Sequence, residues 1–297
     1  MKKEIFRGAG VAIVTPLNEN GIDFDELAKL IDYNIENGTN AIIITGTTGE
    51  SATLTDEEHK AAIKFTVEHV NKRIPVIAGT GSNDTDYAVQ LSIYAQEVGA
   101  DALLLVTPYY NKTSQKGLIE HFTYIADRVN IPIILYNVPS RTGVNIQPET
   151  YLELSKHPRI VATKEASGDF SAVIKIRALC KDNLHVYSGN DDQIVPMLSL
   201  GCKGVISVLS NIMPKETSDI CKLFFEGKIE ESSKLQIELL DLINALFIEV
   251  NPIPIKTAMN LVGHKVGELR RPLTTMTDKN LEVLKQALKN HNLLYFW

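Results

Sequence analysis

Eight short apolar runs, each the length of a β-strand, recur along the chain and constrain its fold more than any other feature. Each run is apolar throughout, as in a strand that is buried on both faces, and segments with helical periodicity separate the runs. This alternation is typical of a parallel sheet, and eight repeats predict a (β/α)8 barrel, with a doubly wound open sheet as the alternative. The runs cover residues 10–15, 40–45, 74–79, 100–108, 131–137, 160–164, 184–189 and 203–208.

The segments between the runs carry helix signals of their own. In residues 23–38 apolar side chains share one face at helical spacing, and Gly38 supplies a stop. Residues that favour the N-cap position precede three other segments, namely Thr55, Asp169 and either Asn83 or Asp84. The helical segment after the eighth run ends near residue 225.

The remaining residues, 226–297, also have helical periodicity and contain no linker or low-complexity stretch. We therefore expect a catalytic barrel of residues 1–225 and a C-terminal helical region, residues 226–297, that packs on the barrel. The chain ends in NLLYFW, to which the sequence assigns no role.

Composition and charge do not favour several classes of partner. The chain has 297 residues, of which 44% are hydrophobic, so it can bury a large core. The net charge of -6, without a long basic run, disfavours nucleic acid and anionic membranes as partners. The first apolar run is too short and too glycine-interrupted for a secretory signal, and no run is long enough to span a bilayer. We expect a cytoplasmic location.

Three cysteines, Cys180, Cys202 and Cys221, are an odd number without Cys-x-x-Cys spacing. They fit neither a disulfide framework nor a zinc site, and the histidines lack the spacing of metal ligands. We expect no metal and no other cofactor.

Lys164 closes the sixth apolar run, and an isolated lysine at such a place usually marks only the end of a strand. In a (β/α)8 barrel, however, the active site lies at the C-terminal ends of the strands. A lysine held in an apolar barrel mouth loses solvation of its charged form, which leaves a fraction as free amine that can attack a ketone or aldehyde. Tyr136 closes the adjacent run and could transfer protons, although many strand-end tyrosines are only rim residues.

Two further strand ends carry groups that suit carboxylates. The turn around Thr47 and Thr48 offers backbone N–H groups and two hydroxyls, or is only a turn and helix cap. Arg141 could hold a second carboxylate in bidentate fashion, or is only an exposed loop arginine. The loops after the seventh and eighth runs contain no cationic side chain that could bind a phosphate group, so phosphorylated substrates are not expected. The predicted substrates are small keto or aldehyde acids.

Six motifs extend this interpretation to a family: GTTGES, TPYYN, LYNVPSRTG, IVATKEASGD, GVISV and NPIPIK. Together they resemble the dihydrodipicolinate synthase family, from GAGVAIVTP to about residue 290. Other pyruvate-dependent lyases, such as N-acetylneuraminate lyase, share the barrel, the lysine and the turn. The SRTG arginine and the tyrosine pair of TPYYN resemble the synthases in particular.

The resemblance implies a role for each matching residue. Lys164 would form an imine with pyruvate, Thr47 and Thr48 would hold its carboxylate, and Tyr136 would transfer protons. The enamine would then attack the aldehyde of aspartate semialdehyde, whose carboxylate Arg141 would hold. Cyclisation would release Lys164 and give 4-hydroxy-tetrahydrodipicolinate, an intermediate of diaminopimelate and lysine biosynthesis.

The same resemblance implies that the site needs a second copy of the chain. Tyr110 would complete a proton relay with Thr47 and Tyr136 from a neighbouring subunit, in a tight dimer within a tetramer. Gly189 and Ile206 match positions that line the pyruvate pocket.

A regulatory pocket for lysine is the last feature that the resemblance implies. Asp56 stands where sensitive family members carry a histidine, and Tyr87 stands where they carry a glutamate, so we expect weak or absent inhibition by lysine. The matching residues are Ser51, Ala52, His59, Asn83 and Tyr109.

Two alternatives use the same barrel. One is another keto-acid lyase such as N-acetylneuraminate lyase, against which Arg141 argues. The other is a catalytically silent barrel, against which the presence of the lysine and the tyrosines argues.

Overall fold

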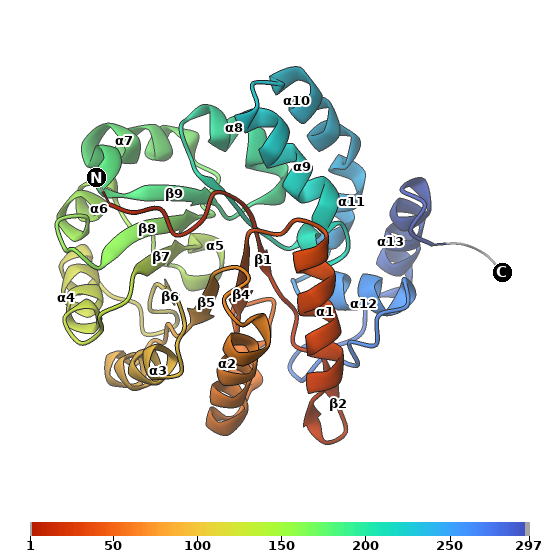
Figure 1. Cartoon of the computed structure of the whole chain (residues 1–297), viewed down its shortest axis with the longest axis horizontal. Helices are drawn as coiled ribbons and strands as arrows, with labels where there is room; N and C mark the ends of the chain where they lie inside the picture. Colours follow the sequence, from red (N-terminus) through yellow and green to blue (C-terminus); the bar gives the residue numbers. More distant parts are fainter. Residues whose placement is uncertain (1, 295–297) are drawn as a thin grey trace.

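Eight parallel strands close into a barrel in the computed structural model, which describes residues 2–294 (Figure 1). The first strand, β1, pairs with both β4 and β10, so the sheet has no free edge. The predicted barrel is confirmed, and the open sheet is excluded. The strands are β1 (Gly8–Ala12), β4 (Ala41–Ile44), β5 (Val76–Gly79), β6 (Ala102–Val106), β7 (Ile133–Asn137), β8 (Ile160–Glu165), β9 (His185–Ser188) and β10 (Gly204–Ser207). A small hairpin, β2 (Leu17–Asn18) with β3 (Gly21–Ile22), was not predicted.

Helices surround the barrel, and the predicted caps begin three of them. Thr55 forms a capping box with Glu58, Asp84 caps α3 and Asp169 caps α7. The helices of the barrel are α1 (Phe24–Glu36), α2 (Asp56–Val70), α3 (Thr85–Glu97), α4 (Gln115–Ala126), α5 (Pro139–Thr142), α6 (Pro148–Leu154), α7 (Phe170–Cys180), α8 (Ile194–Ser199) and α9 (Pro214–Phe225). Within residues 2–294, no helix combines the length and the apolarity that crossing a bilayer requires.

The C-terminal helices lie against one side of the barrel and reach its mouth. Up to residue 294 this region forms four helices: α10 (Ile229–Glu238), α11 (Leu240–Leu246), α12 (Ile253–Leu261) and α13 (Asp278–Asn290). α10 packs on α9, and α12 contacts the short turn that follows β10. The division at residue 225 stays a prediction, and residues 295–297 of the aromatic end lie outside the described residues.

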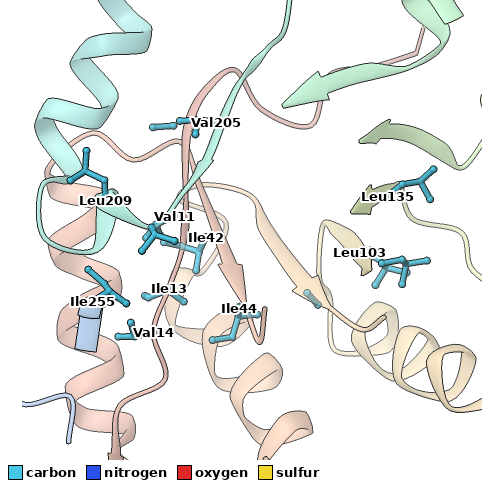
Figure 2. Close-up of a cluster of buried hydrophobic side chains, with 14 of the residues drawn as sticks. Val11, Ile13, Val14, Ile42, Ile44, Leu103, Leu135, Val205, Leu209 and Ile255 are labelled. Atoms are coloured by element: carbon cyan, nitrogen blue, oxygen red, sulfur yellow. The ribbon is translucent and has the colours of Figure 1, made fainter. Parts of the chain in front are cut away.

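Alternating side chains of the strands divide the core into two clusters. Ile42 and Ile44 face the helices, whereas Ile43 between them faces the barrel interior. Figure 2 shows the outer cluster, where Val11 of β1 lies beside Ile42 of the neighbouring strand β4 and Ile255 of α12 belongs to the same cluster. The same alternation decides which strand-end side chains can reach the centre of the barrel.

The N-terminal end of the barrel is closed by aromatic rings. Phe6 stacks on Tyr187 with ring centroids 4.3 Å apart, and the Tyr187 hydroxyl donates a hydrogen bond to the Phe6 carbonyl. The Lys2 ammonium group donates to the carbonyl oxygens of Ser155, His157 and Ile160, the last of which begins β8. The opposite end of the barrel, where the strands terminate, stays open.

Candidate active site

A cavity of about 180 Å³ opens at the carboxyl ends of the strands. Its position is the one that the barrel fold predicts for an active site. Of the eight residues predicted to act at the active site, six line this cavity: Thr47, Thr48, Tyr136, Arg141, Lys164 and Gly189.

Lys164 lies next to Tyr136 because β7 and β8 pair in parallel with these two residues in register. Each follows an interior-facing residue by two positions, Ile134 on β7 and Ala162 on β8, so both side chains face the barrel interior. The Lys164 ammonium nitrogen is 4.4 Å from the centre of the Tyr136 ring. Lys164 is only 6% exposed, yet its amine forms no hydrogen bond or ion pair with any residue in the described part of the chain. The amine is therefore available to a ligand in the cavity.

Gly189 leaves the space through which the Lys164 side chain extends. A Cβ atom at this position would lie 2.6 Å from the Ala166 Cβ and 3.2 Å from the Lys164 Cε. Any larger residue would crowd the lysine, so the cavity requires glycine here.

Asp191, which the sequence analysis missed, fixes the loop after β10. Its carboxylate accepts hydrogen bonds from the backbone N–H groups of Val208 and Leu209, each 3.0 Å long. Burial raises the pKa of Asp191, while these donors and the nearby charge of Lys164 act in the opposite direction. Val208 lines the cavity, so the buried carboxyl group shapes one of its walls.

The turn after β4 presents free donors to the cavity. Its backbone closes on itself, since the Gly49 N–H donates to the Gly46 carbonyl and the Glu50 N–H donates to the Thr47 carbonyl. The N–H groups of Thr47 and Thr48 have no acceptor among residues 2–294. Such paired N–H groups are suited to an anionic oxygen.

A buried ion pair anchors this turn to the C-terminal helices. Lys256 of α12 donates to Glu50 over 2.8 Å, and both side chains are about 1% exposed. The other Glu50 oxygen accepts from the Arg270 backbone N–H, and Lys256 also donates to the Glu268 carbonyl. Burial lowers the pKa of Lys256, and the charge of Glu50 opposes this shift. The pair fixes α12 beside the turn.

Replacing Lys256 with methionine is expected to lower the free energy of unfolding by about 3 to 5 kcal/mol, because it leaves the Glu50 carboxylate buried and unpaired. Chemical denaturation of the variant and the parent measures the loss. The double variant Glu50→Gln, Lys256→Met is the matched control, and it should recover part of the stability because neither charge remains. Equal stability of the parent and the single variant would show that the pair is dispensable.

Asn251 and Phe247 line the cavity from the C-terminal region, and neither was predicted as a site residue. The Asn251 amide nitrogen donates to the Thr48 hydroxyl over 3.1 Å, and the Asn251 carbonyl accepts from the Arg141 guanidinium over 3.1 Å. The motif NPIPIK, which begins at Asn251, carried the signal, but no role was assigned to it.

Two predicted residues lie outside the cavity lining. Ile206 is fully buried in the barrel interior, in the same cluster as Tyr136. Tyr110 is 92% exposed and has a left-handed backbone with φ of 69°. No hydrogen bond joins Tyr136 to Thr47 within residues 2–294, so the three groups of the predicted relay are not connected in one chain.

Two contacts involve residues of the predicted lysine pocket. His59 is buried, its Nε2 lies 2.8 Å from the Gly79 carbonyl, and burial lowers its pKa. Asn83 donates to the Tyr109 carbonyl. Ser51 and Ala52 belong to a short 3₁₀ turn before α2.

Comparisons of the sequence and of the structure with known proteins point to one family. A model of the "Dihydrodipicolinate synthetase family" matches residues 5–291. The 4-hydroxy-tetrahydrodipicolinate synthase of Acetivibrio thermocellus is 60% identical over 99% of this chain and 100% of its own. The dihydrodipicolinate synthase structure from Aquifex aeolicus is 46% identical with a TM-score of 0.95 and covers 97% of this chain and 99% of its own. A lysine-bound structure from Cyanidioschyzon merolae is 40% identical with a TM-score of 0.95 and covers 98% of this chain and 100% of its own.

In the described part of the chain, no cluster of three or more His, Cys, Asp or Glu side chains could hold a metal ion.

Proposed function

Because the chain belongs to the dihydrodipicolinate synthetase family, we propose that its cavity condenses pyruvate with aspartate semialdehyde through an imine on Lys164. The activity is that of the relatives, 4-hydroxy-tetrahydrodipicolinate synthesis, a lyase-class reaction of diaminopimelate and lysine biosynthesis. The observation that carries the assignment of Lys164 is its buried amine, which has no partner among residues 2–294 and lines the strand-end cavity.

The first half of the reaction forms the nucleophile. The Lys164 amine attacks the keto carbon of pyruvate, and loss of water from the resulting carbinolamine gives the imine. Tyr136 lies beside the amine and has a hydroxyl that can both donate and accept a proton during these steps. The unpaired N–H groups of Thr47 and Thr48 support binding of the pyruvate carboxylate. Loss of a methyl proton then gives the enamine.

The second half uses the outer part of the cavity. The enamine carbon attacks the aldehyde of aspartate semialdehyde, and the amino group of that substrate displaces Lys164 by adding to the imine carbon. Arg141 lines the cavity and is exposed at its rim, which supports contact with the carboxylate of the second substrate.

Borohydride trapping tests the chemistry of the first half. Incubation with pyruvate and sodium borohydride should add one reduced pyruvyl group to Lys164, which peptide mass spectrometry locates. A product assay with aspartate semialdehyde then separates synthase activity from that of a keto-acid lyase. Absence of any pyruvate-dependent mass increase would remove Lys164 from the mechanism.

We further propose that the active form is a tight dimer within a tetramer, in which Tyr110 enters the partner's site. A tyrosine side chain that is 92% exposed, on a left-handed backbone, supports this role because neither feature stabilises an isolated chain.

Mixing two impaired variants should restore activity if Tyr110 acts in the partner's site. A Lys164→Ala subunit lacks the amine but supplies Tyr110, whereas a Tyr110→Phe subunit retains the amine. Hybrid dimers should therefore exceed both parents in turnover, and each parent mixed with itself is the control. Activity in sedimenting monomers that equals that of the oligomer would contradict the proposal.

Lysine is expected to inhibit weakly or not at all, because Tyr87 replaces the glutamate and the nearby Asp56 carboxylate is already paired. Asp56 already pairs with Lys60 over 2.6 Å and accepts from the Tyr87 hydroxyl over 3.0 Å. Burial and this hydrogen bond raise the pKa of Tyr87 to about 12, so the phenol stays neutral. Losing one charge-assisted hydrogen bond weakens binding about tenfold to a hundredfold.

Titration of the initial rate with lysine at subsaturating pyruvate measures this inhibition. Tyr87→Glu is the matched variant, and it should make the enzyme more sensitive to lysine. Strong inhibition of the parent at sub-millimolar lysine would show that another group neutralises the ligand.

A cytoplasmic location completes the proposal. The three cysteines are buried and unpaired, which is usual for proteins of a reducing compartment.

A further inference from the structure

We propose that Asn251 is a positioning residue that sets the direction of the Thr48 hydroxyl and thereby selects a carboxylate at the pyruvate end of the cavity. The inference rests on the proposed function, since it concerns the acid that reacts with Lys164. Asn251 lines the cavity from the segment before α12 and is 5% exposed.

The hydrogen bond between Asn251 and Thr48 has a defined polarity. The Asn251 amide nitrogen can only donate, so the Thr48 oxygen is the acceptor in this 3.1 Å contact. The Thr48 hydroxyl proton is then free to point elsewhere, and it has no acceptor among residues 2–294. In the cavity, this proton becomes a donor to an anionic oxygen beside the free Thr47 and Thr48 N–H groups.

The position of Asn251 costs stability and is not explained by folding contacts alone. Its amide oxygen is buried and accepts no hydrogen bond within residues 2–294. An unsatisfied buried acceptor is unfavourable, so burial alone does not account for an amide at this position. The one hydrogen bond that the amide group makes in the described structure is the bond to Thr48.

Asn251 also connects the two ends of the cavity. Its backbone carbonyl accepts a hydrogen bond from Arg141, the group proposed to bind the carboxylate of aspartate semialdehyde. Its side chain donates to Thr48, the group proposed to bind the carboxylate of pyruvate. The ion pair between Glu50 and Lys256 fixes α12 beside the turn, which keeps Asn251 in place.

Asn251→Asp tests the polarity because a carboxylate can only accept. It would take the Thr48 proton, turn this hydroxyl away from the substrate and add a negative charge near the bound acid. We expect the pyruvate concentration for half-maximal borohydride trapping to rise about tenfold to a hundredfold. Asn251→Ala removes the donor without reversing the polarity and should raise it about fivefold.

Methyl pyruvate provides the readout that a merely structural defect would not give. This neutral ester lacks the carboxylate, so its half-maximal concentration should change by less than about twofold in both variants, because the lost interaction is specific to charge. Asn244→Asp, an added charge on an exposed position of α11, is the matched control and should trap pyruvate like the parent.

The outcomes separate this inference from the proposed function. Trapping by the parent together with a selective loss for pyruvate supports the role of Asn251. Equal losses for pyruvate and its ester, or no loss in Asn251→Asp, overturn that role and leave Lys164 chemistry intact. If Asn251→Asp does not fold, the selective loss in Asn251→Ala decides. Failure of the parent to trap pyruvate overturns both.

Discussion

Replacing Lys164 with alanine or arginine is expected to abolish the borohydride-stable pyruvate adduct and nearly all synthase activity. Among the described residues that line the cavity, Lys164 is the one primary amine. The arginine variant keeps a positive charge but has no nucleophilic amine at ordinary pH, so it separates covalent chemistry from electrostatic attraction. Intact-mass spectrometry after reduction measures the adduct, and a product assay measures activity.

The matched control for this experiment is Lys222→Ala. Lys222 is exposed on α9, away from the strand ends, so its removal should leave the adduct and the rate unchanged. Retention of the adduct in either Lys164 variant would place the imine on another residue.

Replacing Tyr136 with phenylalanine should preserve the fold and slow turnover by roughly 10² to 10⁴, the range for loss of a positioned proton-transfer group. The ring that contacts the Lys164 amine remains, and only the hydroxyl is removed. The hydroxyl has no partner within residues 2–294, so its loss breaks no hydrogen bond of the described fold. The expected effect is therefore on kcat and not on stability.

Two measurements distinguish this role from a structural one. Thermal unfolding should be nearly unchanged in Tyr136→Phe, while single-turnover trapping with pyruvate should be slow. Tyr33→Phe, which removes a hydroxyl that donates to the Ile212 carbonyl outside the cavity, is the control and should keep the parent rate. An unchanged kcat in Tyr136→Phe would exclude proton transfer by this residue.

The sequence was sufficient to predict the strands because each one centres on a short apolar run with polar turns nearby, and the polar residues fall mainly at the strand ends. Adjacent residues of β4 such as Ile42 and Ile43 face opposite sides, but both sides of the strand are buried, so the apolar run is continuous. Strand ends then led to Lys164 and Tyr136 as candidate site residues, since a parallel barrel gathers all its strand ends at one mouth. The chemistry followed from position, and the particular substrates followed from the resemblance.

Side chains that lie outside the strands could not be assigned to the site in this way. Asn251 follows the last strand by more than one helix, and helical periodicity does not say which helix end faces the barrel mouth. Asp191 lies in a turn where its residue type suggested only a loop. Tyr110 was named from the resemblance alone, and its side chain is exposed in the single chain.

The stacked rings of Phe6 and Tyr187 fill the N-terminal end of the barrel in the described structure, so the cavity is reached from the carboxyl ends of the strands. Both substrates and the product must pass through this opening. The substrate that binds deeper in the cavity must therefore enter first. If Lys164 forms the proposed imine and Arg141 holds the second substrate near the rim, the acid that bonds with Lys164 has to arrive before the aldehyde. A second substrate that enters too early blocks the path of the first, and an excess of it should therefore slow the enzyme.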